Sequence, residues 1–363
     1  LGFAWDVFGD GKTSLRGGGG FFYDQHFTPL YNIGASQAWP WGMAVNLTTP
    51  KGSFSDPYLG LDNTFNNYKL STVGTPTEPN FPPTQITGMQ SSIVTPVTYN
   101  WNLTLEREVH KVVARLAYVG STQIHGIYQK ELDPAVYIPG SSLGTDARRV
   151  FAPYYSTMVN TTQDSVSHYH SLQASMTKRL SQGFTVLANY TFSKSMDDGT
   201  RNGVLSGGGT GATSEVAPIF YMPGARRMVY GPSDFDHRHV FVLSYVWQLP
   251  KLSTSNLAAR QVLNGWEVSG IANVQSGSPL TLTSGLDNSK TGIGRDRAQL
   301  TGVSSAAPAG ADPTVWFNTA AYTLNPVGTF GNYGIGQLYG PGLFTWDMGI
   351  FKNIPLKERL TMQ

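Results

Sequence analysis

The chain has 363 residues, of which 13% are charged and 12% are aromatic, and its formal net charge is +2. Soluble domains usually carry about 25% charged residues. Low charge together with 41 glycines and 22 prolines favours an all-β protein over a helical one. The near-neutral charge gives no electrostatic case for a nucleic-acid partner, and the lack of cysteine excludes a disulfide framework or a thiolate metal site within this chain.

No stretch of the sequence is suited to span a membrane as a helix. The longest nearly apolar run covers residues 240–247, whereas a spanning helix needs about 20 apolar residues. No signal peptide is recognisable either. The chain begins and ends inside predicted strands, so we expect it to be an internal piece of a longer protein.

The first predicted hairpin occupies the start of the chain. Residues alternate from position 1 to position 8, residues 9–12 contain the Asp-Gly signal of a tight turn, and a second strand continues to Tyr23. The glycines at residues 17–20 do not form a phosphate loop, because a strand follows them instead of a Lys-Ser/Thr pair and a helix. They indicate a strand that is bent or closely approached.

A long irregular segment separates this hairpin from the next. Residues 24–96 have no sustained period and predict a loop of about 70 residues, which is unusually long for a compact soluble domain. Strands are predicted at residues 99–106 and 112–119, joined by a short charged turn at residues 109–111. A second loop, of about 45 residues, is predicted at residues 121–167.

The clearest hairpin covers residues 169–198. A period of two lasts for about ten residues in each strand, which is the length of a tilted membrane-spanning strand. Gly183 is suited to the turn because glycine accepts a positive φ. In the second strand, we expect one set of side chains to face lipid (Phe184, Val186, Ala188, Tyr190 and Phe192) and another to face a wet lumen (Thr185, Asn189 and Thr191).

Three further strands are predicted at residues 239–249, 265–276 and 344–351. Residues 257–263, between the first two, have room for one or two helical turns. The last strand turns at residues 354–358 and restarts at Leu360. Residues 196–236 and 277–343 are irregular.

The connections between these strands, about ten in number, are alternately short and long. Consecutive connections of antiparallel neighbours lie at opposite ends of a sheet. All the short turns should therefore lie at one end and all the long loops at the other. Outer-membrane barrels have this asymmetry, with short periplasmic turns and long extracellular loops.

Aromatic residues near the predicted strand ends suggest two girdles, as expected where rings meet the two lipid–water interfaces. The alternative is that aromatic residues are simply common in strands. The girdle beside the long loops would comprise Tyr23, Tyr99, Tyr118, Tyr169, Tyr190 and Phe192, and the girdle beside the short turns would comprise Phe8, Trp247, Trp266 and Phe351.

Six segments of the chain carry a family pattern. They are LGFAWDVFGDGKTSLRGGGGFFYD, YNWNLTLEREV, HSLQASMTKRLSQGFTVLANYTFSKSMDD, FDHRHVFVLSYVWQLP, NGWEVSGIANVQSGSPLT and GPGLFTWDMGIFKNIPLKERL. Together they resemble the TonB-dependent outer-membrane receptors. More narrowly, they resemble the Oar-like group, in which a carboxypeptidase-regulatory-like domain precedes the plug. The resemblance covers nearly all the predicted strands and little of the loops.

This resemblance implies an all-β fold, a transmembrane antiparallel β-barrel of 22 strands to which the chain contributes about ten. Residues 1–363 would form part of that barrel domain, with the plug and the carboxypeptidase-regulatory-like domain outside them. The resemblance also implies uptake driven by a TonB-type energising protein, which grips a short box before the plug. No residue of the chain matches that box, so no contact with this partner is assigned.

Two histidine pairs, His168 with His170 and His237 with His239, each place two imidazoles on one strand face and suggest a metal site. The sequence fixes no third ligand nearby, so a solvated barrel rim is the favoured interpretation. Residues 287–296 are rich in oxygen-bearing side chains, as a calcium loop is, but Asx turns use the same residues. We therefore predict no metal site and no cofactor.

No constellation of residues predicts catalysis. The acidic residues Asp197, Asp198, Asp234 and Asp236 flank one loop segment, where turn chemistry explains them. No serine lies in a nucleophile elbow, and the glycine-rich residues 206–211 indicate a flexible loop. The sequence therefore predicts a protein that is not an enzyme.

Aromatic and arginine residues in the long loops are the predicted ligand-binding set, because such residues dominate recognition surfaces. The alternative is that they pack the loops together. The set comprises Trp39, Trp41, Tyr154, Tyr155, Tyr221, Arg226 and Arg227.

Three hypotheses for function follow. The first is an outer-membrane receptor and transporter in contact with outer-membrane lipid, which takes up a small-molecule, glycan or peptide ligand. The second is an outer-membrane adhesin or surface scaffold that binds without transport. The third is a soluble secreted β-rich module that binds glycans.

Overall fold

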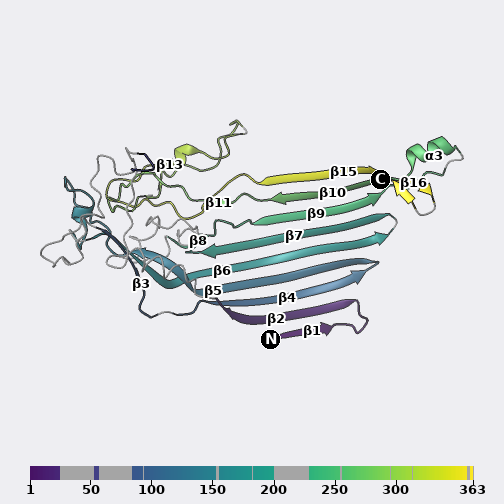
Figure 1. Cartoon of the computed structure of the whole chain (residues 1–363), viewed down its shortest axis with the longest axis horizontal. Helices are drawn as coiled ribbons and strands as arrows, with labels where there is room; N and C mark the ends of the chain where they lie inside the picture. Colours follow the sequence, from purple (N-terminus) through teal and green to yellow (C-terminus); the bar gives the residue numbers. More distant parts are fainter. Residues whose placement is uncertain are drawn as a thin grey trace.

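The computed structural model describes residues 1–24, 53–56, 84–92, 94–152, 155–181, 183–199, 229–253, 256–294, 296–312, 314–357 and 360–362. One large β-sheet dominates this part of the chain (Figure 1). Its main path runs through nine strands in the order in which they occur in the sequence, and all neighbours on this path are antiparallel. The strands are β1 (Gly2–Asp6), β2 (Thr13–Tyr23), β4 (Val97–Val109), β5 (Val112–Glu131), β6 (Tyr155–Ser181), β7 (Phe184–Asp197), β9 (His239–Gln248), β10 (Trp266–Gln275) and β15 (Leu343–Lys352).

Short turns lie at one end of the sheet, and the long connections leave from the other end (Figure 1). Tight turns join β1 to β2, β4 to β5 and β6 to β7. His110 and Lys111, between β4 and β5, have φ angles of 48° and 67°, the left-handed conformation that a two-residue hairpin turn requires. Gly183 has φ 76° in the β6–β7 turn. The predicted asymmetry of turns and loops is confirmed.

The connection from β9 to β10 contains α3 (Leu257–Leu263). Asn256 caps this helix, because its side chain accepts a hydrogen bond of 3.1 Å from the Ala259 amide. The predicted helical segment is therefore confirmed. Among the residues that the structure describes, no helix has the length and apolar character needed to cross a membrane. The described residues also include the 3₁₀ turns η1 (Asp146–Arg148) and η3 (Thr319–Ala321).

β5 and β6 extend well beyond the predicted strands, to lengths of 20 and 27 residues. Much of the loop predicted at residues 121–167 is therefore strand. The alternation of apolar and polar residues fails in these strand extensions for two reasons. The β5–β6 register shifts near Gly126, and β6 is covered on both faces, because the successive residues Thr161 and Thr162, which point to opposite faces, are both buried. A strand covered on both faces does not read as apolar on one side and polar on the other.

The predicted loop at residues 24–96 contains β3 (Thr84–Met89), which pairs in parallel with β6. The predicted last strand is also corrected. Leu360–Met362 forms β17, which pairs with β16 (Ile354–Lys357) in a separate two-stranded sheet, so residues 354–357 are strand and not turn. The remaining small strands are β8 (Gly231–Pro232), which pairs with β7, and β11 (Pro279–Leu280), β12 (Gln299–Leu300), β13 (Tyr322–Thr323) and β14 (Leu338–Tyr339).

The register of the main sheet separates its side chains into two faces, because directly paired residues point the same way. One face is apolar, and many of its large side chains are 39% to 64% exposed. In a protein surrounded by water, such a continuous surface would be a liability. We call it the apolar face, and its exposed members include Phe3, Trp5, Tyr99, Leu103, Leu105, Leu116, Tyr118, Leu172, Met176, Tyr190, Phe192, Trp247, Val274, Phe344, Trp346, Met348 and Ile350.

The opposite face, called the polar face below, carries mostly hydroxyl, amide and charged side chains. Arg16 and Glu106 form an ion pair of 3.0 Å on this face. Leu187 and Ile271 are apolar exceptions. Other members are Asn102, Thr104, Arg115, Ser171, Gln173, Ser175, Asn189, Thr191, Ser244, Ser269, Asn273 and Asp347.

Two residues of the predicted aromatic girdles lie on the polar face. Tyr169 pairs with Ser121 and Ser195, and Phe351 pairs with Glu267. Each is one position out of phase with the apolar residues of its strand, so neither points with the girdle. Tyr118, Tyr190 and Phe192 do lie on the apolar face.

Candidate ligand-binding site in the outer loops

Two long connections meet beyond the ends of the strands. They are the β5–β6 loop, described for residues 132–152, and the β10–β15 loop, residues 276–342. The Ala135 amide donates to the Thr291 carbonyl at 3.0 Å. Arg148 Nη1 donates to the carbonyl of Lys290 at 2.8 Å and to that of Val136 at 2.6 Å. Backbone and side-chain bonds therefore hold the two loops together.

A buried acid anchors the β5–β6 loop to the sheet. The side chain of Glu131, the last residue of β5, is fully buried. Its Oε1 accepts hydrogen bonds from the amides of Met158 at 2.8 Å and Asp133 at 3.0 Å. Arg149 Nη1 lies 3.6 Å from the same oxygen, and this guanidinium is itself only 3% exposed. The loop is thus fixed by a buried ion pair together with amide donors.

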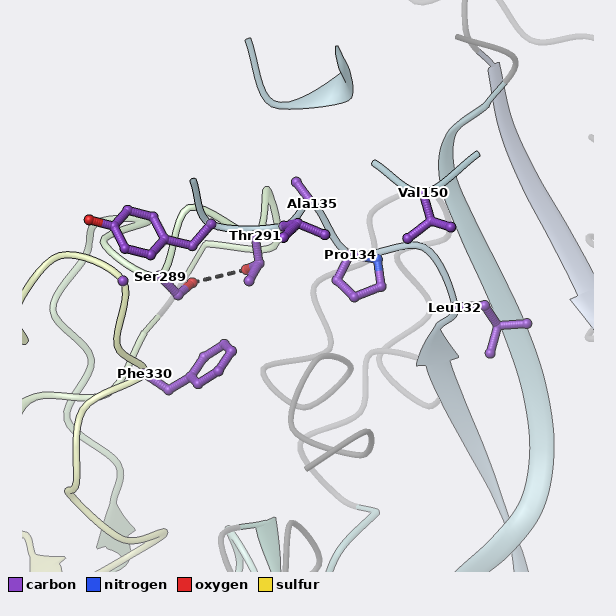
Figure 2. A pocket seen from close by; sticks show the side chains of 10 residues that line it. Leu132, Pro134, Ala135, Val150, Ser289, Thr291 and Phe330 are labelled. Carbon is purple, nitrogen blue, oxygen red and sulfur yellow. Dashed lines mark hydrogen bonds between the residues drawn. The ribbon is translucent and has the colours of Figure 1, made fainter. Parts of the chain in front are cut away.

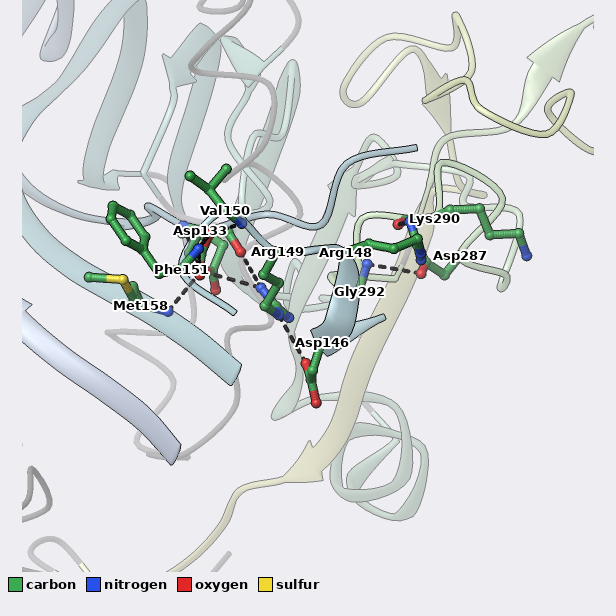
Figure 3. Close-up of polar contacts among 11 residues, drawn as sticks. Asp133, Asp146, Arg148, Arg149, Val150, Phe151, Met158, Asp287, Lys290 and Gly292 are labelled. Carbon is green, nitrogen blue, oxygen red and sulfur yellow. Dashed lines mark hydrogen bonds and ion pairs between the residues drawn. The ribbon is translucent and has the colours of Figure 1, made fainter. Parts of the chain in front are cut away.

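Asp133 and Arg149 complete this anchor. The Asp133 carboxylate accepts from the amide of Val150 at 2.8 Å and from that of Phe151 at 3.3 Å. Arg149 donates to the Asp133 carbonyl, and its Nε donates to Asp146 at 3.0 Å. These contacts fix the backbone around Val150 (Figure 3), and Val150 lines the cavity described below.

Burial raises the pKa of the Glu131 carboxyl above its ordinary value of 4.5, although the amide donors and Arg149 oppose this shift. An acid whose pKa is higher in the folded state stabilises the fold more when it is protonated. Its favourable contribution is therefore complete below the ordinary pKa and is lost as the pH rises through the folded pKa. Order in the β5–β6 loop should decrease in this range.

This pH dependence predicts a measurable difference between the wild type and Glu131→Gln. Residues 1–363 contain no cysteine, so within them a spin label on Ser142→Cys reports on the β5–β6 loop. We expect the label to become more mobile in the wild-type background as the pH rises above about 4.5, and to stay constant in Glu131→Gln, which has no acid to ionise. An equal pH response in both backgrounds would contradict the assignment to Glu131.

The two loops enclose an apolar cavity of about 460 Å³ (Figure 2). This volume is in the range of small-molecule sites. Val150 is 70% exposed and Val136 is 50% exposed, so the rim offers uncovered apolar surface. Ser289 and Thr291 contribute the hydroxyls, which bond to each other at 2.9 Å. The full lining is Leu132, Pro134, Ala135, Val136, Tyr137, Val150, Ser289, Thr291, Gly328 and Phe330.

The sequence reasoning did not identify this cavity. Its lining residues come from segments with no periodic pattern, and residues from the two loops meet only in the folded chain. Of the predicted ligand-binding residues, Trp39, Trp41, Tyr154, Tyr221, Arg226 and Arg227 lie outside the described residues. Tyr155 is the first residue of β6. Its role in ligand binding stays a prediction.

The histidine pairs do not gather metal ligands. His168 Nδ1 bonds Thr122 at 3.0 Å, His170 Nδ1 bonds Tyr118 at 2.8 Å, and His237 Nδ1 contacts the Ser276 carbonyl at 2.7 Å. In the part of the chain that the structure describes, no three His, Asp or Glu side chains are grouped as a metal site requires. The histidines lie at the rim of the sheet, as the favoured interpretation expected.

The oxygen-rich segment at residues 287–296 forms Asx-type turns. The Asp287 carboxylate accepts from the amides of Thr291 at 3.1 Å and Gly292 at 2.9 Å, and from Ser289 Oγ at 3.1 Å. Asp296 accepts from the Ser289 amide at 2.6 Å. Hydrogen-bond donors therefore occupy both carboxylate oxygens of Asp287 and Oδ2 of Asp296.

The acidic residues around residues 197–236 also have structural partners. Asp198 accepts from Ser165 Oγ at 2.7 Å, and Asp236 accepts from the Ser195 amide at 2.7 Å. Asp197 accepts from the Gly199 amide at 2.8 Å. The Asp197 bond is local, as the predicted turn chemistry expects. The Asp198 and Asp236 bonds instead join residues that are 33 and 41 positions apart in the sequence.

The sheet, its two faces and its one-sided loops define a class of membrane-spanning β-barrel proteins. The family model for the outer membrane beta barrel domain matches residues 1–363. The chain belongs to this family, and the protein is located in the outer membrane. The apolar face therefore faces lipid, and the third hypothesis, a soluble secreted module, is wrong.

The comparison with solved structures found the outer membrane transporter YddB from Escherichia coli. The two share 12% sequence identity at a TM-score of 0.42, over 79% of this chain and 29% of the transporter chain. This chain thus spans less than a third of the length of that protein. No curated protein matched the chain.

Proposed function

We propose that the full-length protein is an outer-membrane receptor and transporter, and that the apolar cavity between the β5–β6 and β10–β15 loops receives part of its ligand. The cavity carries this proposal, because it presents uncovered apolar side chains on the side of the long loops, which face the cell exterior in such barrels. An anchored backbone at Val150 keeps one wall of the cavity in place. The proposed role is binding and transport, not catalysis.

A polar interior supports passage of the ligand. The face opposite the lipid carries hydroxyls, amides and the Arg16–Glu106 pair, as in a water-filled lumen. Within the described residues, β1 and β15 form the two edges of the sheet. Because hydrocarbon does not tolerate an open sheet edge, we propose that further strands of the full-length protein close the barrel, to 22 strands as the family resemblance implies.

The proposal also includes the energy source of transport. The resemblance of six strand segments to TonB-dependent receptors of the Oar-like group supports coupling to a TonB-type protein through a box outside residues 1–363. The ligand class stays open among iron chelates, cobalamin, glycans and peptides. The cavity favours a ligand with an apolar portion, because most of its lining is apolar. Among its ten lining residues, the polar side-chain atoms are the hydroxyls of Tyr137, Ser289 and Thr291.

Uptake by cells that produce the full-length protein tests the proposal. Radiolabelled members of the four ligand classes are offered to cells with and without the energising protein. We expect one of them to accumulate only in energised cells. We also expect Val150→Lys at the cavity rim to reduce its uptake roughly tenfold, because a charge there must be desolvated when an apolar group binds.

Val303→Lys is the matched control, because Val303 is 52% exposed in the β10–β15 loop and does not line the cavity. It should leave uptake unchanged. Binding that persists in cells without the energising protein, with no accumulation in energised cells, would contradict transport and indicate the adhesin or scaffold. Equal uptake by Val150→Lys and the wild type would contradict the assignment of the cavity.

A further inference from the structure

A small group of cationic and aromatic side chains lies on the apolar face, where the face ends toward the long loops. We call it the rim cluster, and its members are His170 on β6, Lys194 and Phe192 on β7, and His239 on β9. His170 is directly paired with Lys194, and His239 with Phe192. Three neighbouring strands thus present polar nitrogens at one level of a surface that otherwise faces lipid.

The depth of the rim cluster in the bilayer follows from the length of the strands. About ten residues of β7 separate Phe184 at the short turn from Lys194, which is the length that a tilted strand needs to cross the hydrocarbon layer. The cluster therefore lies at the outer lipid–water interface. A cation at this depth meets lipid headgroups instead of acyl chains.

Two tyrosines hold the histidine rings in the same way. The Tyr118 hydroxyl bonds His170 Nδ1 at 2.8 Å, and the Tyr190 hydroxyl bonds His239 Nδ1 at 2.8 Å. Each ring also stacks on its tyrosine, with interplanar angles of 21° and 26°. In the tautomer in which Nδ1 accepts the hydrogen bond from the tyrosine hydroxyl, Nε2 carries the ring hydrogen. Neither Nε2 has a hydrogen-bond partner among the described residues, so in this tautomer both can donate to a ligand.

Lys194 adds a positive charge to the rim cluster. Its side chain is exposed, and it has no ion pair within the described residues. Arg238 lies nearby, with its guanidinium carbon 6.0 Å from the Phe192 ring centre, although Asp236 at 4.0 Å offsets part of its charge. One ammonium and, in this tautomer, two imidazole N–H donors match the oxygens of a phosphate group.

We propose that the rim cluster binds the phosphorylated headgroup of an outer-leaflet lipid. The charge of the cluster favours an anion, and its position on the lipid-facing side of the barrel favours a membrane lipid over a soluble ion. The proposal rests on the family and on the orientation of the sheet. It does not depend on transport.

Native mass spectrometry of the delipidated full-length protein tests the proposal, with bisphosphorylated lipid A as the probe and fully dephosphorylated lipid A as the comparison. We expect the wild type to retain the phosphorylated probe. The combined variant His170→Gln, Lys194→Gln and His239→Gln should retain roughly tenfold less. Lys178→Gln is the matched control, because Lys178 lies on the same face of β6 near the short turn and should retain the probe as the wild type does.

Three results would overturn the proposal. They are equal retention by the combined variant, equal retention of the dephosphorylated lipid, and displacement of the probe by millimolar inorganic phosphate, which would indicate a site for a free anion. Assembly of each variant is checked by its heat-dependent electrophoretic mobility. If the combined variant does not assemble, the single variant Lys194→Gln takes its place, and equal retention of the phosphorylated lipid by this variant would overturn the proposal. The comparison of the two lipids on the wild type does not depend on any variant.

Discussion

Arginine in place of Ala188 is expected to block assembly of the barrel in the membrane. Ala188 lies on the apolar face of β7, between Met176 and Leu243 on the neighbouring strands. It is near the middle of the span from the short turn to the rim cluster. A cation facing lipid at the bilayer midplane costs about 2–4 kcal/mol. Ala188→Arg should therefore lose the heat-dependent electrophoretic mobility of the assembled protein.

Asn189→Arg is the control for this result. Asn189 is the next residue of β7, and it lies on the polar face between Ser175 and Val242. An arginine there reaches a wet interior and should be tolerated. If the two variants assembled equally well, or if only Asn189→Arg failed, the assignment of the two faces would be wrong.

Alanine in place of Arg149 is expected to release the β5–β6 loop without preventing membrane assembly. Removal of one partner from a buried ion pair costs about 3–5 kcal/mol, because the other charge stays buried and unpaired. Here the remaining charge would be Glu131, and the carbonyl of Asp133 would lose its donor as well. Hydrogen exchange at neutral pH should increase at residues 132–152 and stay unchanged in β4 and β9.

Lys130→Ala provides the comparison. Lys130 forms an ion pair with Asp164, whose side chain is 45% exposed, and such exposed pairs contribute about 0–1 kcal/mol. Little change in exchange is expected from this variant. An equal, small effect of both substitutions would show that the buried pair does not anchor the loop.

The architecture of the sheet was predictable because of the lipid environment. A strand with lipid on one side and a polar interior on the other must alternate, as β7 does from Phe184 to Phe192. Turn chemistry located the hairpin ends, for example at Gly183. The position of each membrane-spanning strand could therefore be read from the alternation of apolar and polar residues.

The outer ends of β5 and β6 could not be predicted in this way. There the chain leaves the bilayer, and protein covers both faces, as the burial of the successive residues Thr161 and Thr162 demonstrates. A bulge near Gly126 also shifts the phase of β5 relative to β6. Without a lipid face the period of two disappears, although the backbone pairing continues.

The candidate site was not predictable from the sequence for a related reason. Glu131 and Arg149 are separated by a loop, and their pairing is fixed only by the return of the chain at Met158. Val150 and Phe330 line one cavity from two different loops. Residue type alone pointed to aromatic residues and arginines, whereas the cavity is lined mainly by aliphatic side chains.

The orientation of the barrel is the central claim, and cysteine labelling in cells tests it most directly. The chain has no cysteine, so Ser142→Cys in the β5–β6 loop and Lys12→Cys in the β1–β2 turn each introduce one new target for a bulky maleimide that cannot cross the membrane. In intact cells, Ser142→Cys should react and Lys12→Cys should react only after the outer membrane is permeabilised. Equal labelling of Lys12→Cys in intact cells, or protection of Ser142→Cys, would contradict the account.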